Sequence, residues 1–110
     1  MQIIDDTLQA LGITRNYKGY PHIAFAIELA VEDEERLRSV TKEIYFVTAK
    51  HFHCHWTSVE RNIRTVIQRA WQINPTLLDE MAGFRLAATP TVGEFLGITT
   101  AYIQRMALPR

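Results

Sequence analysis

Hydrophobic side chains recur at spacings of three and four along most of this chain, and no alternating pattern of strand type extends beyond a few residues. The strongest helical pattern covers residues 55–72, where the apolar positions form one face. The positions on that face are Val59, Ile63, Val66, Ile67, Ala70 and Trp71. The pattern as a whole predicts an all-α protein, a compact helical bundle of about six or seven helices.

Four further helices are predicted before residue 55 and directly after residue 74. Residues 2–11 form a helix that stops at Gly12, and Pro21 suits the first turn of a second, deeply buried helix. Residues 32–45 predict a single charged helix, and Pro75 opens a short helix. The inward positions of the charged helix are Leu37, Val40 and Ile44.

The C-terminal part of the chain contains clear stop and start signals. Gly83 closes the short helix, and residues 84–90 predict an extended connector because the residue before Pro90 avoids the helical region. Thr91 and Glu94 have the spacing of a capping box at the start of the last helix. The apolar stripe of that helix comprises Phe95, Ile98, Tyr102, Ile103 and Met106.

Composition indicates one ordinary globular domain over residues 1–110. The chain is 47% hydrophobic and 22% charged, and its lone Cys54 cannot form an internal disulfide. No stretch has the pattern of a signal peptide or of a membrane span. We therefore expect a cytoplasmic protein with no membrane partner.

The formal net charge of zero conceals a segregation of charge along the chain. Residues 1–35 carry two basic and seven acidic side chains, whereas residues 36–69 carry seven basic and two acidic ones. Residues 70–110 are balanced. A basic middle third indicates a nucleic-acid partner, although clustering of charge on solvated helix faces would give the same pattern.

The stretch "KHFHCHWTSVER", residues 50–61, concentrates the residue types of metal sites and of nucleophilic catalysis. His51, Cys54 and His55 could share a metal ion, but no second cluster completes a closed site and the spacing matches no zinc finger. A cysteine nucleophile needs a base and an oxyanion hole that sequence adjacency does not supply. We predict no metal, no cofactor and no enzyme activity, and keep a metal-responsive regulator as the least favoured alternative.

The same stretch fits a helix-turn-helix that begins at Tyr45. Ala49 is then the small fifth residue of the unit, His53 lies at the turn, and Val59 is the β-branched residue that fixes the second helix. Histidine enters the left-handed region more readily than most residues do. The sequence therefore predicts a sharp bend near residue 53 and a recognition helix over about residues 55–72.

A recognition helix in that position directs polar side chains outward along its first half. Arginine grips guanine with two hydrogen bonds and glutamate accepts one from cytosine. The predicted base-reading residues are Ser58, Glu60 and Arg61. The predicted contacts to the DNA backbone are Lys50, His55, Thr57, Arg64, Thr65 and Arg85. Two alternatives remain open: Glu60 and Arg64 could form an ordinary surface salt bridge, and Thr57 with Glu60 could form a second capping box.

Four segments, "GITRNYKGY", "SVTKEIYFVTAKHF", "VERNIRTVIQRAW" and "TPTVGEF", together resemble a known family. The chain is similar over nearly its whole length to the C-terminal DNA-binding effector domain of the stage zero sporulation protein A, a response regulator of spore-forming bacteria. The resemblance implies an all-helical bundle with a helix-turn-helix that binds short DNA boxes, often in tandem. It also implies regulation of transcription through contact with RNA polymerase, and it places Val59, Glu60 and Arg61 on the family's base-reading motif.

Several residues depart from the family's pattern. Ser58 stands where the family usually has an arginine, residues 54–56 replace a threonine-rich turn, and the connector offers only Arg85 where the family has several lysines. We expect a sequence-specific transcription regulator that binds double-stranded DNA at the nucleoid, as a homodimer or tandem pair. The alternative is an interaction module that has lost base reading and pairs with a full-length relative.

Overall fold

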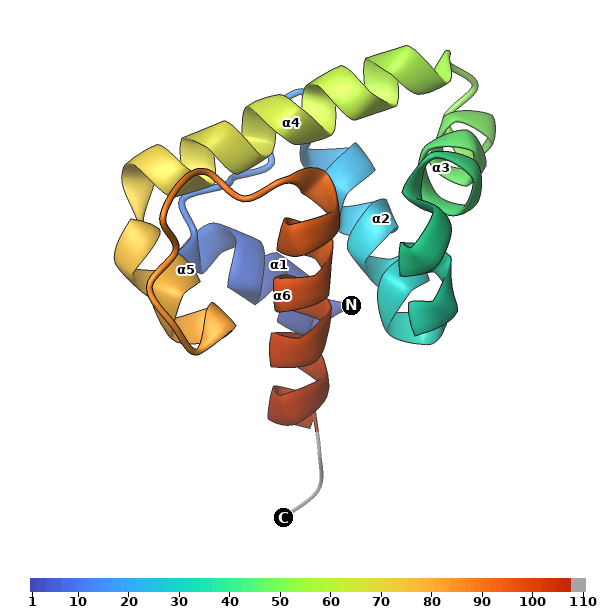
Figure 1. Ribbon diagram of the computed structural model, residues 1–110. Helices are drawn as coiled ribbons and strands as arrows, with labels where there is room; N and C mark the ends of the chain where they lie inside the picture. Colours follow the sequence, from blue (N-terminus) through green and yellow to red (C-terminus); the bar gives the residue numbers. More distant parts are fainter. Residues whose placement is uncertain (108–110) are drawn as a thin grey trace.

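The structure is a computed structural model that describes residues 1–107 (Figure 1). Within that range the chain forms six α-helices and two shorter helical segments, with no strand. They are α1 (Gln2–Ala10), α2 (Tyr20–Glu32), the 3-10 segment η1 (Glu34–Ser39), the π-helical segment η2 (Thr41–Tyr45), α3 (Phe46–His51), α4 (Trp56–Ile73), α5 (Pro75–Ala82) and α6 (Val92–Ala107). The predicted all-α bundle is confirmed.

The longest helix, α4, crosses one face of the bundle from end to end, and α6 runs away from it into the protein (Figure 1). The core forms where α2, α4 and α6 meet. Ile23 and Ile27 of α2, Ile63 of α4, and Phe95 and Ile103 of α6 are all completely buried there. The burial of one face of α4 against this core leaves its opposite face open to solvent. No helix within residues 1–107 is long and apolar enough to span a membrane.

The predicted ends of α1 and α5 are confirmed, because Gly12 and Gly83 follow these helices with φ values of 87° and 85°. Gly12 also lies against the end of α4. A Cβ atom at this position would stand 2.5 Å from Cγ2 of Ile73, so neither the backbone angle nor the available space suits another residue. The prolines at 21 and 75 lie in the first turns of α2 and α5, as predicted.

The single charged helix predicted over residues 32–45 is wrong. Asp33 has extended backbone angles, which end α2, and its carboxylate accepts a hydrogen bond from the Glu35 N–H to start η1. The chain then continues through η2 into α3, with a change of hydrogen-bond pattern at each step. The widened turn of η2 allows the consecutive residues Ile44 and Tyr45 both to be buried. The other two inward positions, Leu37 and Val40, are only half-buried.

The start of α6 has the predicted capping box. The Thr91 N–H donates to Oε1 of Glu94 at 2.9 Å, and the Glu94 N–H donates to Oγ1 of Thr91 at 3.1 Å. The apolar stripe of α6 reaches the core at its beginning but not at its end. Met106 is 58% exposed, because the last turn of α6 extends past the residues that cover the rest of the helix.

Candidate nucleic-acid interface

The chain bends sharply between α3 and α4, at the predicted position. The Cys54 N–H donates to the Ala49 carbonyl at 3.0 Å, and His53 has a φ of 55°, in the left-handed region. Ala49 and Val59, the small and β-branched residues expected to lock the two helices together, are both buried. The predicted helix-turn-helix is therefore present (Figure 1).

The first turn of α4 is capped by an imidazole. Nδ1 of His55 accepts the Thr57 N–H at 3.3 Å and lies 2.8 Å from the Thr57 hydroxyl. Helix α4 therefore begins at Trp56, and the alternative capping box formed by Thr57 and Glu60 is wrong. Because Nδ1 of the neutral ring is the acceptor, Nε2 carries the proton and remains available as a donor.

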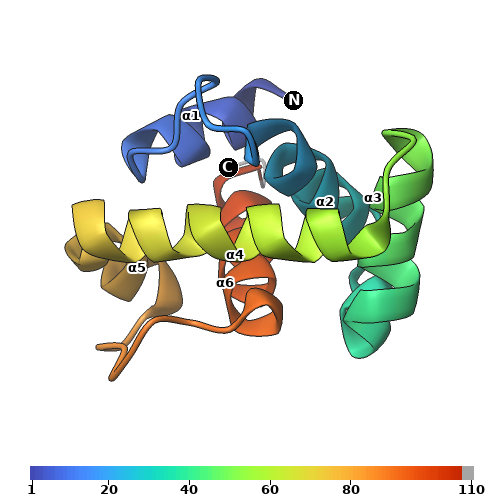
Figure 2. The same cartoon turned by 90° about the horizontal axis from the view of Figure 1, so that it is seen from above.

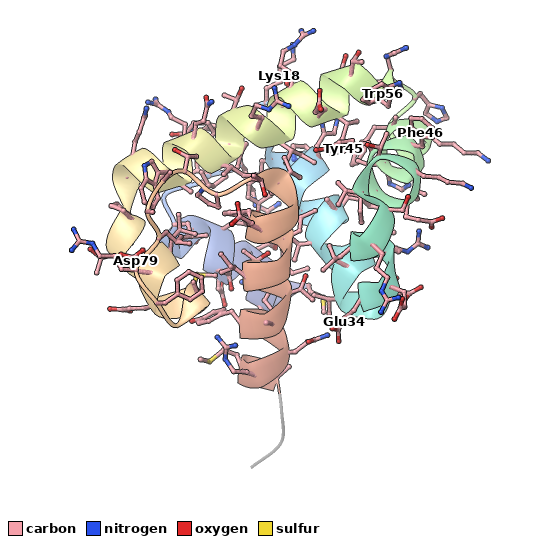
Figure 3. All side chains as sticks on the ribbon, in the orientation of Figure 1. Lys18, Glu34, Tyr45, Phe46, Trp56 and Asp79 are labelled. Carbon is pink, nitrogen blue, oxygen red and sulfur yellow. The ribbon has the colours of Figure 1, made fainter. Side chains whose placement is uncertain are left out.

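Trp56, the first residue of α4, is held by aromatic packing against the preceding helical segments. Its ring lies parallel to that of Tyr45, with centroids 6.3 Å apart, and meets the edge of Phe46 at 5.7 Å. Figure 3 shows these three side chains gathered beneath the start of α4. Burial raises the pKa of the Tyr45 hydroxyl, and the Glu60 carboxylate raises it further. The packing of Trp56 fixes the direction in which α4 leaves the turn.

Helix α4 separates its apolar and polar side chains as predicted. Val59, Ile63, Val66, Ile67 and Ala70 are buried, whereas Trp71 is only half-buried. The predicted DNA-contacting residues of α4 all reach the surface. Arg61, Arg64 and Thr65 are exposed, and Thr57, Ser58 and Glu60 are half-exposed.

The surface ion pair expected as an alternative role for Glu60 is present. Nη2 of Arg64 lies 3.2 Å from Oε2 of Glu60, and the two side chains are 60% and 33% exposed. Arg61 has no carboxylate partner within residues 1–107. The Thr65 hydroxyl donates to the Arg61 carbonyl at 3.0 Å, which leaves the oxygen of that hydroxyl as an acceptor.

Three of the predicted contacts come from outside α4, and two of them, Lys50 and His55, lie near its first half. Lys50 is exposed beside the turn and lines a shallow depression together with Cys54 and His55. Arg85 lines a different depression, with Trp71 and Asp79. Trp71 is about 22 Å along α4 from the first residue of the helix, at 1.5 Å per residue. Figure 3 accordingly shows Asp79 and Trp56 at opposite ends of the molecule.

The histidines and the cysteine around the turn have separate surroundings in the described structure. The His51 ring stacks on Phe25, with centroids 4.2 Å apart and an interplanar angle of 16°. His55 uses Nδ1 to cap α4, and Cys54 is exposed. No group of three His, Cys, Asp or Glu side chains within residues 1–107 is placed to hold a metal ion. Nothing in this arrangement supports the metal-responsive alternative.

The sequence did not predict that the loop before α2 contacts α4. Gly19 lies against the Asn62 carbonyl in the middle of α4, and this brings Lys18 to the edge of the same surface (Figure 3). Nearby, Nδ2 of Asn62 lies 3.2 Å from Nδ1 of His22, whose pKa is lowered by burial. No periodic pattern joins positions so far apart along the chain, so the sequence contained no signal for this contact.

A helix-turn-helix whose second helix exposes a row of cations and hydroxyls is the architecture of a DNA-binding domain. Comparison with known families agrees with that class. The family described as "Sporulation initiation factor Spo0A C terminal" matches residues 4–103, and the chain belongs to this family. This family is a DNA-binding domain of sporulation regulators and is not known as a family of enzymes.

Proposed function

We propose that this protein regulates transcription by inserting the first half of α4 into the major groove of double-stranded DNA. The observation that carries the proposal is the bend at His53, because it turns the outer face of α4 away from the bundle, where no other element of residues 1–107 covers it (Figure 2). A helix inserted in this way reads bases with residues near its N-terminus and is held by phosphates on either side.

Arg61 is the principal base-reading residue in this proposal. It is exposed and unpaired with any carboxylate within residues 1–107, so its guanidinium can approach a guanine without breaking an existing ion pair. Ser58 lies one helical turn before Asn62. It offers a short hydroxyl at a position where the family usually has the long, cationic side chain of an arginine. A serine at this position favours a different base preference from that of an arginine-bearing relative.

Glu60 can read cytosine despite its ion pair with Arg64. An exposed pair at this helical spacing contributes only about 0.3–0.5 kcal/mol, whereas a well-made base contact contributes about 1–3 kcal/mol of discrimination. Breaking the pair also releases Arg64 toward a phosphate. In the absence of DNA the ion pair therefore holds both side chains in place, and breaking it on DNA binding costs little free energy.

The proposed phosphate contacts surround the start of α4. Lys50 lies beside the turn, and the proton on Nε2 of His55 is available to a phosphate oxygen. The hydroxyls of Thr57 and Thr65 add weaker contacts. Arg85 is a peripheral contact in this scheme, because it lies beside the opposite end of α4.

The test begins with selection of bound duplexes from a random pool, followed by a salt titration on the selected sequence. Arg61→Ala should relax the base preference and weaken binding by about 1–3 kcal/mol. Lys50→Ala should weaken binding to all sequences alike and reduce the log–log salt slope by about 0.9. Arg38→Ala is the matched control, because Arg38 is exposed on η1 and pairs with Glu35 away from α4. A pool with no enriched sequence would refute base reading.

As a second proposal, this protein associates with a partner through the surface beside α6. The partner is a second copy of the chain, in a homodimer or a tandem pair, or a full-length relative. Phe84 and Met106 are 64% and 58% exposed, and Gly97 lines an open depression beside Phe84. Phe84→Ser should therefore reduce self-association in sedimentation. If selection enriches no duplex while Phe84→Ser abolishes pairing, the interaction module is the better description. Contact with RNA polymerase remains a prediction from family resemblance.

A further inference from the structure

The loop before α2 is clamped against the middle of α4. A Cβ atom on Gly19 would stand 2.5 Å from the Asn62 carbonyl oxygen and 2.7 Å from Cγ2 of Val66, so only glycine allows this approach. The neighbouring Lys18 is therefore carried on backbone that is fixed relative to α4. Figure 2 shows this loop on one side of α4 and the connector before α6 on the other side.

Lys18 is not the only cation on this side of α4. Arg69 is exposed one turn beyond Val66, and its guanidinium carbon lies 5.9 Å from the centre of the Tyr17 ring. The half-buried Tyr17 belongs to the same loop as Lys18. The loop thus supplies one cation directly and supports a second one through an aromatic ring.

The loop that carries Lys18 contains no acidic side chain of its own. Residues 12–23 contain no aspartate or glutamate, and neither does the first turn of α2. The only acid of α4, Glu60, lies on the opposite side, where it lines a depression with Tyr45 and Thr91. Arg15 also belongs to the loop, but it pairs with Asp5 at 3.1 Å. Lys18 and Arg69 have no carboxylate within ion-pair distance among residues 1–107.

We propose that Lys18 and Arg69 form a second phosphate-binding flank, which grips one DNA strand while Arg64 faces the other strand. This inference rests on the proposed insertion of α4. A helix in the major groove, which is about 12 Å wide, has a sugar-phosphate backbone along each of its sides. The ligand of Lys18 and Arg69 is therefore a pair of backbone phosphates, and these two residues contribute affinity without reading sequence.

The first experiment is a salt titration of the full chain on its selected duplex. Lys18→Ala and Arg69→Gln should each reduce the log–log slope by about 0.9, and the double variant by about twice that, with unchanged base preference. Arg38→Ala removes the same charge from a segment that lies away from α4. If the log–log salt slope falls equally in Lys18→Ala and in Arg38→Ala, the change in slope reflects only the net charge of the protein, and the proposal is overturned.

Ethylation interference then locates the phosphates. Phosphates on both strands should interfere in the unmodified protein. Lys18→Ala should lose interference on one strand only, and Arg64→Gln on the other strand only. Thermal unfolding confirms that each variant is folded. Lys18→Ala and Arg69→Gln could leave both the salt slope and the interference pattern unchanged while Lys50→Ala reduces the salt slope. In that case this inference fails and the proposed function stands. If no duplex binds the unmodified chain, both fail.

Discussion

The chain contains the pattern Thr-x-x-Glu twice, at residues 57–60 and 91–94, each at the start of a long helix. At α6 the threonine and the glutamate cap the backbone reciprocally. At α4 the helix begins one residue before the threonine, and the His55 ring takes the role of the cap. Because His55, two residues before Thr57, is already the N-cap of α4, Thr57 lies inside the first turn and no capping box forms there.

The two helix starts are consequently suited to different tasks. Glu94 is occupied by the Thr91 N–H and helps to anchor the connector to α6. Glu60 does not cap the backbone of α4, and within residues 1–107 its carboxylate forms an ion pair with Arg64 at the surface. The imidazole cap thus leaves an acidic side chain available on the helix that we propose reads DNA.

The largest expected effect concerns the packing of the first helical residue. Trp56 touches the rings of Tyr45 and Phe46, whereas Val92, the first residue of α6, is a half-buried aliphatic residue. Trp56→Ala should lower the free energy of unfolding by about 2–3 kcal/mol, and Val92→Ala by about 1 kcal/mol. Urea denaturation followed by circular dichroism measures both. Equal losses would show that aromatic packing does not fix the start of α4.

The next largest effect is the difference in stability loss between alanine substitutions at Thr91 and at Thr57. Thr91→Ala removes the N-cap side chain of α6 and should cost about 1 kcal/mol. Thr57→Ala leaves the bond from the residue 57 N–H to His55 intact, so it should cost about 0.3 kcal/mol or less, in the range of an ordinary surface substitution. The same denaturation experiment compares the two variants. A Thr57→Ala loss as large as that of Thr91→Ala would mean that Thr57 acts as a cap after all.

The sequence predicted most of this fold, because its helix stops and starts depend on local chemistry. Gly12, Gly83, Pro21 and Pro75 each act on their own backbone, and the pattern of buried residues in α4 is strong enough to survive errors at its ends. The helix-turn-helix was predicted for the same reason. Its key positions lie within one short stretch of the chain.

Features that depend on distant contacts or on unusual chemistry were not predictable. The change from 3-10 to π-helical structure before α3 accompanies hydrogen bonds from Arg36 to the backbone and side chain of Glu43, which hydropathy does not reveal. Histidine is not among the residues that commonly cap helices, so no pattern marked His55 as the cap of α4, and the box formed by Thr57 and Glu60 stayed open as an alternative. The approach of Gly19 to Asn62 joins segments with no shared pattern.

A double-mutant cycle gives a smaller but more specific test of the two helix starts. Thr91→Ala and Glu94→Gln should be non-additive, because these residues are bonded to each other in both directions. Thr57→Ala and Glu60→Gln should be additive, because Thr57 contacts His55 and Glu60 contacts Arg64. Each cycle is measured by urea denaturation at neutral pH. Non-additivity of the second pair would indicate that a Thr57–Glu60 box forms in solution.

The smallest effect is a pH dependence confined to the α6 start. The backbone hydrogen bond from Thr91, and then the hydrogen bond with its side chain, lower the pKa of Glu94 from its ordinary value of 4.5. Below that value the unfolded chain binds more protons at this position than the folded chain does, so acid lowers stability until the folded carboxylate is also protonated. Glu94→Gln should remove this part of the loss between pH 5 and the acid limit, in urea titrations. Thr91→Ala keeps the backbone N–H of residue 91 that donates to Glu94, so this variant should retain part of the acid-dependent loss of stability. If Glu94→Gln loses stability with acid as steeply as the unmodified chain, the carboxylate is not engaged at the start of α6, and the contrast between the two helices disappears.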